Sequence, residues 1–155
     1  MLTTLILSAF LSAAPEGVDP ATVTFVFRAG DLPRARDIAL KCRKFAPKVC
    51  GKMFRGLVDY QFLIPRSDAL SLAEAKQLIA LDRMLSPEEP GRLTLPILAQ
   101  YVTFPLAQAT EALKGQNVSL ALSFVDRVLS VDPKNVRALE LQKACREAAV
   151  IDAGR

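Results

Sequence analysis

The chain has 155 residues, of which 51% are hydrophobic and 23% are charged, and its formal net charge is +4. This length and composition indicate one folded domain that is large enough to bury a core of its own. The sequence contains no histidine, which excludes histidine metal ligands, histidine general bases and the Ser-His and Cys-His nucleophile pairs.

The first fourteen residues, MLTTLILSAFLSAA, carry no charged side chain. They are fewer than the ~20 apolar residues that a membrane-spanning helix needs, so no membrane span is expected in the mature chain. They resemble the apolar region and small-residue end of a secretory signal. We therefore expect residues 1–14 to be a signal peptide and the protein to be periplasmic or secreted. The start of this stretch contains no Lys or Arg, which a secretory signal normally has there, and Pro15 follows it directly. The alternative is therefore an apolar first helix in a cytoplasmic protein.

Residues 15–20 read as a turn-rich linker, and three helices are expected after it. Asp19-Pro20 predicts the start of a helix over 20–29, with Asp as the N-cap and Pro in the first turn. The second helix is predicted over 33–46, where apolar residues recur at steps of three and four. Pro47 is expected to stop it. The third helix is predicted over 49–63.

The remaining helices follow a break at 64–68. Ser71 stands three residues before Glu74, which is the spacing of a capping box and predicts a helix start at Ser71. The segment 94–115 contains Pro105, so it is either one helix that kinks at this proline or two helices, the second capped by Thr103. The last two helices are predicted at 118–131 and 134–151.

One spacing recurs three times along the chain. An alanine is followed twelve residues later by a proline in Ala35–Pro47, Ala75–Pro87 and Ala121–Pro133. Each stretch reads as an amphipathic helix of one length. A helix that recurs in this way is typical of a helical repeat array, in which stacked hairpins bury a continuous core.

The residues of the third unit resemble a tetratricopeptide repeat. The matching positions are Ala109, Ala112, the turn Gly115-Gln116-Asn117, Ala121 and the closing Asp132-Pro133. The first unit matches at Gly30-Asp31, Ala35 and Pro47, whereas the middle unit keeps Ala75 and Pro87 and has a longer turn. The resemblance covers about three divergent repeats over roughly residues 20 to 150.

The resemblance implies a fold and a function. The fold is all-α, a right-handed superhelical stack of helical hairpins over residues 21–151 with a C-terminal capping helix, and another helical-hairpin array is its main competitor. The function is that of a non-catalytic protein–protein interaction scaffold or adaptor, exported and serving an envelope-associated complex. The alternative is a cytosolic three-repeat chaperone or adaptor that binds a peptide segment of a secreted or assembled partner. No enzyme activity and no cofactor are expected.

Positive charge is concentrated in one window. Residues 28–55 contain nine basic and two acidic residues, a local charge of +7. Such asymmetry attracts an acidic partner, although a solvated helix face is the plainer interpretation. The window has few aromatic residues for base stacking, so the expected partner is an acidic protein or peptide and not a nucleic acid. The candidate partner-binding residues are Arg34, Arg43, Lys44, Lys48, Lys52 and Arg55.

The three cysteines are Cys42, Cys50 and Cys145, and none forms a CxxC pair. Without histidine, such a set does not indicate a zinc site. If the chain is exported, a disulfide between Cys42 and Cys50 is favoured by an oxidising compartment. The alternative is that all three are small buried residues, since free cysteines pack well in cores.

Overall fold

The computed structural model describes residues 13–154, and all of their regular elements are helical. The elements are α1 (Pro20–Arg28), α2 (Leu32–Cys42), α3 (Pro47–Leu63), the 3-10 helix η1 (Ile64–Ala69), α4 (Leu72–Leu85), α5 (Leu95–Leu98), the π-helical turn η2 (Ala99–Thr103), α6 (Phe104–Lys114), α7 (Val118–Val131) and α8 (Val136–Ala153). Because α5, η2 and α6 follow one another without a break, the described residues hold seven consecutive helices besides η1. The predicted all-α class is confirmed. Residues 1–12 of the predicted signal peptide lie outside the described residues.

Side chains at the predicted positions begin several of these helices. The Asp19 carboxylate accepts the backbone N–H of Thr22 at 2.8 Å, and Pro20 is the first residue of α1. Ser71 and Glu74 form the predicted capping box at the start of α4. Each cap satisfies a backbone N–H that the first turn of a helix leaves without a partner.

Pro47 has a different role from the predicted one. α2 already ends at Cys42, and Pro47 is the first residue of α3. A proline is well tolerated at this position, because the first helical N–H needs no partner within the helix and the fixed φ of proline suits the turn. The prediction that Pro47 stops the preceding helix was therefore wrong, whereas Pro87 and Pro133 do lie just beyond the ends of α4 and α7.

The segment 94–115, which contains Pro96 as well as Pro105, forms one continuous helical run. Thr103 has helical dihedral angles and its side chain caps nothing, so of the two predicted alternatives the single helical run is found and the second helix capped by Thr103 is not. The turn before Pro105 widens into η2, in which the N–H of Phe104 bonds to the carbonyl oxygen of Ala99. π-helical turns are rare, and most are single turns of this kind inside an α-helix that continues on both sides.

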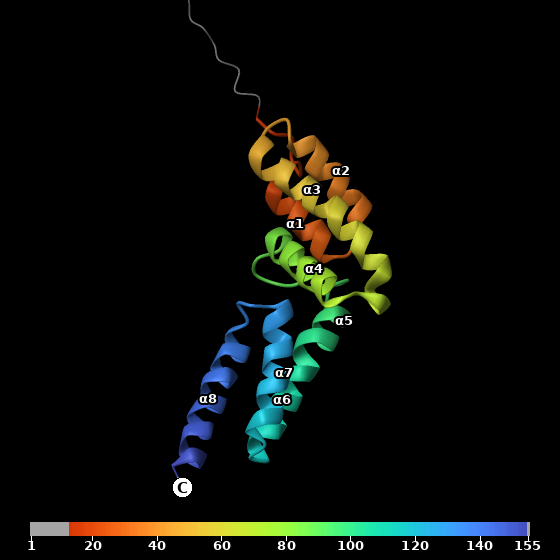
Figure 1. The fold of residues 1–155 in the computed structure, drawn as a ribbon. Coiled ribbons are helices and arrows are strands. Elements are labelled where there is room, and N and C mark those ends of the chain that lie inside the picture. Colours follow the sequence, from red (N-terminus) through yellow and green to blue (C-terminus); the bar gives the residue numbers. More distant parts are fainter. Residues whose placement is uncertain (1–12, 155) are drawn as a thin grey trace, which may run out of the picture.

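The helices form an elongated molecule, with α1–α4 at one end and α6–α8 at the other (Figure 1). In the first half, neighbours in the sequence pack together, and the end of α4 returns to α1. There the Thr24 hydroxyl donates to the carbonyl oxygen of Leu85 at 2.7 Å. In the second half α7 packs between α6 and α8, and α4 packs against α7 to join the halves.

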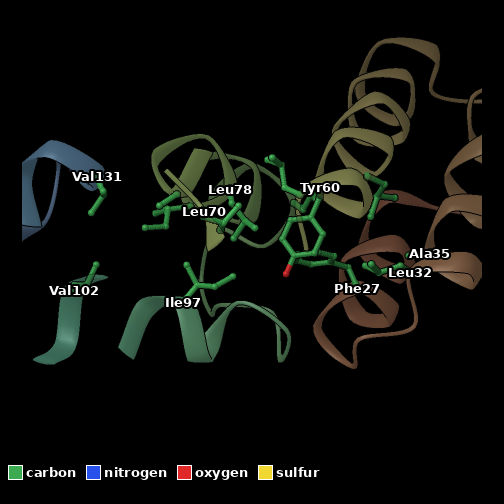
Figure 2. Close-up of a cluster of buried hydrophobic side chains, with 14 of the residues drawn as sticks. Phe27, Leu32, Ala35, Tyr60, Leu70, Leu78, Ile97, Val102 and Val131 are labelled. Carbon is green, nitrogen blue, oxygen red and sulfur yellow. The ribbon is translucent and has the colours of Figure 1, made fainter. Parts of the chain in front are cut away.

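One apolar core runs through both halves. Figure 2 follows it from Ala35 on α2 through Tyr60 and Leu78 to Ile97 and Val131. The alanines that open the three repeated spacings, Ala35, Ala75 and Ala121, are completely buried. Small side chains at these positions let neighbouring helices approach closely, which explains why alanine recurs there.

Candidate functional site

A disulfide joins the two helices that carry most of the candidate residues. Cys42 ends α2 and Cys50 lies in the first turn of α3; their sulfurs are bonded and their Cα atoms are 5.7 Å apart. Both cysteines are buried. The bond closes a short loop around the connection 43–46, and the end of α2 is thereby held against the start of α3. Structural disulfides of this kind are typical of oxidising compartments.

All six candidate cations are exposed to solvent. Among the residues that the structure describes, none of the six has a carboxylate within the 4.0 Å that defines an ion pair. By contrast, Lys41 of α2 forms an ion pair with Asp37, with 2.8 Å between Lys41 Nζ and Asp37 Oδ2. The candidate residues therefore present positive charge that no acidic side chain of the described chain neutralises.

The structure separates the six cations into two surfaces and one outlier. Arg43, Lys44 and Arg55 line a hollow of about 440 Å³ between α2 and α3, together with Leu40, Pro47 and Gly51. We call it the basic hollow. A Cβ added at Gly51 would meet no atom within 4 Å, so the glycine leaves the floor of the hollow open. The guanidinium of Arg43 lies 5.6 Å from the ring centre of Phe54, a cation–π contact that steadies this side chain.

Lys48 and Lys52 line a second depression, on another side of α3. Its volume is about 530 Å³, and its walls come from α1, α3 and the end of α4; we call it the α1/α3/α4 groove. Apart from the two lysines it is lined by Pro20, Ala21, Thr24, Val49, Met53, Met84 and Pro87. Arg34, in the first turn of α2, lines neither the basic hollow nor the groove.

Met84 reaches the groove because α3 carries no side chain at Gly56. A Cβ added at Gly56 would collide with the terminal methyl group of Met84. The methionine of α4 therefore lies across the backbone of α3 and forms part of the groove wall. Sequence analysis missed this contact, since a glycine within a helix and a methionine 28 residues later give no joint signal.

A second cluster that sequence analysis missed is a buried chain of polar groups. The Asp82 carboxylate accepts hydrogen bonds from the Gly91 N–H at 3.0 Å and from the Thr94 hydroxyl. Tyr60 Oη lies 2.6 Å from Thr94 Oγ1. Since the proton of Thr94 goes to Asp82, Tyr60 donates to Thr94. Burial raises the pKa of Asp82 and of the Tyr60 phenol above their ordinary values.

This cluster fixes the connection after α4, because its buried hydrogen bonds join residues of α3, α4 and that connection. Asp82, Thr94 and Tyr60 are 3% exposed or less, and they tie the connection 86–94 to α4 and α3. The Tyr60 ring also meets the Phe27 ring edge-on, with 5.0 Å between the ring centres (Figure 2). A signal for the cluster was present, because Asp82 stands at the helical spacing of Leu78 and Leu85 and so replaces an apolar residue of the inward stripe.

The remaining chemistry-bearing groups are isolated. Burial and, to a smaller extent, the Asp126 carboxylate raise the pKa of the Cys145 thiol, which is free and buried in α8. In residues 13–154, no three His, Cys, Asp or Glu side chains come together in a way that can hold a metal ion. Within the same residues, no helix has both the length and the apolar character to cross a membrane.

Comparison with known proteins places the chain in no family. No family model, no curated protein and no solved structure matches the chain.

Proposed function

We propose that this chain is a non-catalytic protein–protein interaction scaffold of tetratricopeptide type that works in an oxidising, periplasmic or extracellular compartment. Its partner is a protein that presents an acidic segment to the α2–α3 surface. The observation that carries the proposal is the group of exposed cations without acidic partners around a disulfide-linked helix pair. A charge displayed on a fixed backbone favours association, because little conformational freedom is lost on binding.

The repeat interpretation rests on packing as well as on spacing. The helix pairs α1–α2, α3–α4 and α6–α7 each pack against each other, and the repeated alanine lies buried in the second helix of each pair. α8 follows the last pair and packs on α7, in the place of a capping helix. In arrays of this class the hairpins serve as a binding surface for other chains.

The proposal is tested by affinity capture with charge-reversal variants. The test variant carries Lys44→Glu, Lys48→Glu and Lys52→Glu. The matched control carries the same number of reversals on α8 and the turn before it, Lys134→Glu, Arg137→Glu and Arg146→Glu; these residues are also exposed. Both variants change the net charge equally, so a general charge effect cancels.

Partners recovered by the wild type and by the control, and lost from the test variant, support a binding surface on α2 and α3. The recovered proteins are identified by mass spectrometry, and the segment that contacts the scaffold is located by cross-linking to lysine. Recovery of the same partners by all three proteins would remove the basis of the proposal, and so would loss from both variants.

A further inference from the structure

We propose that the α1/α3/α4 groove receives the apolar face of an acidic amphipathic helix from the partner protein. This inference rests on the proposed function and specifies the kind of segment that the scaffold recognises. Half of the residues that line the basic hollow are cations, whereas the groove (about 530 Å³ in volume) has mainly apolar walls with two lysines at its rim. That volume lies in the range of sites that enclose drug-sized molecules, about 300–1,000 Å³, so several apolar side chains fit in it.

The groove has the composition of surfaces that accept helices. Met53 comes from α3 and Met84 from α4, and Val49 is exposed to 52% at the entrance. Methionine side chains are flexible and polarisable, and they adapt to ligands of different shape. An amphipathic helix places its apolar anchors at steps of three and four residues, and such anchors pack into apolar grooves.

A further apolar side chain extends the groove along α1. Phe25 stands four residues after Ala21, so both lie on one face of α1. Ala21 lines the groove, and the Phe25 side chain is 73% exposed. An exposed aromatic ring beside an apolar depression is typical of an interaction surface, because covering it removes a large apolar area from water.

The rim indicates the charge of the occupant. Lys48 and Lys52 are four residues apart on α3 and line the groove, so their ammonium groups stand along one edge. No acidic residue of the described chain lines the groove, and the nearby Glu88 and Glu89 lie beside Arg28 instead, at 3.6 and 4.0 Å. The free charge at the rim is therefore positive, and it complements carboxylates that flank the apolar face of a helix.

Three fluorescent peptides test the inference on the full oxidised chain. The first is a fourteen-residue peptide with Leu at steps of three and four and Glu elsewhere, about the length at which isolated helices become marginally stable. The second has the same composition in a scrambled order, and the third is octaglutamate. We expect the patterned peptide to bind at least about tenfold more tightly than the scrambled one, which is about 1.4 kcal/mol.

A blocking variant locates the binding. Ala21→Phe fills the groove from an exposed position, and Ala107→Phe places the same side chain at an exposed position of α6. We expect only Ala21→Phe to remove the preference for the patterned peptide. Circular dichroism verifies that both variants fold.

Methyl NMR gives a local readout of the same binding. The sequence contains three methionines, and Met53 and Met84 line the groove. Their ε-methyl resonances are expected to shift when the patterned peptide binds.

The outcomes separate the groove from the proposed function. Equal affinity for the patterned and scrambled peptides, or a preference that survives Ala21→Phe, overturns the inference about the groove. Binding of octaglutamate in that case still supports the proposed function. If the chain binds the patterned peptide and does not bind octaglutamate, the result counts against the proposed function and not against the groove. A change of oligomeric state in Ala21→Phe, measured by analytical ultracentrifugation, assigns the groove to a second copy of the chain and overturns the proposed occupant.

Discussion

The Cys42–Cys50 disulfide gives a quantitative prediction for stability. The bonded cysteines are eight residues apart. For a loop of this size the chain-entropy model gives an unfolded-state entropy loss of about 8 cal/mol/K, or about 2.5 kcal/mol at 25 °C. We therefore expect reduction of the bond to lower the free energy of unfolding by about 2.5 kcal/mol. This is a large change for a domain whose total stability is of order 5–15 kcal/mol.

The assay is urea unfolding followed by far-ultraviolet circular dichroism, with and without a reductant. At a slope of about 2 kcal/mol/M, the expected loss moves the midpoint down by roughly 1 M urea. A Cys145→Ala background prevents disulfide exchange with the free thiol and is used in both arms. The variant Cys42→Ala/Cys50→Ala is expected to lose at least as much as reduction does, because it also removes two buried sulfur atoms.

Two results would refute this reasoning. Mass spectrometry of the natively prepared protein can find three free thiols, in which case the bond does not form. Alternatively, the reduced protein, verified to contain free thiols, can unfold at the same urea concentration as the oxidised protein. The connection 43–46 would then be held by packing alone.

Other predictions concern the buried polar groups and two glycines. Burial raises the pKa of Asp82, so its contribution to stability is greatest below about pH 4 and is lost as the pH rises through the folded-state pKa; Asp82→Asn should flatten this part of a stability–pH curve. Arg83→Met removes the cation 2.6 Å from the buried Asp132 carboxylate and leaves it only the amide of Asn135 at 3.0 Å. The change should cost roughly 1–3 kcal/mol in urea unfolding, since Arg83 is itself half exposed. Gly91→Ala would bring a Cβ within 2.9 Å of the Phe27 ring. It should lower the free energy of unfolding by about 1–3 kcal/mol, measured as a lower thermal midpoint. Gly51→Ala meets open space within α3 and should raise stability by about 0.5–1 kcal/mol.

Local signals made the helices predictable. Asp19-Pro20 and the pair Ser71 and Glu74 mark two helix starts, and the structure has both caps. These devices act within one turn of the chain, so the sequence contains everything needed to recognise them. Pro47 shows the limit of such signals, because the same residue is typical of the region after one helix and of the first turn of the next.

The candidate surface was predictable only in part. The excess of basic residues from 28 to 55 indicated the region, and all six candidates are exposed. Their division between two depressions depends on which side of α3 each one occupies and on which helices pack there. The groove needs the return of α4 to α1, a contact between residues about 60 positions apart, and helical periodicity contains no information about such distant pairs.

The disulfide constrains residues that line the basic hollow more directly than residues that line the α1/α3/α4 groove. The basic hollow takes Arg43 and Lys44 from the end of α2 and the connection that the bond closes. Without the bond these cations would still be held by the packing of α2 on α3, by backbone hydrogen bonds such as Arg43 N–H to the carbonyl oxygen of Ala39, and by the contact of Arg43 with Phe54. The groove is built from α1, α3 and α4, and the bond between Thr24 and the backbone of α4 spans it independently of the cysteines. An oxidising compartment therefore preorganises the basic hollow more than the α1/α3/α4 groove, which depends chiefly on helix packing.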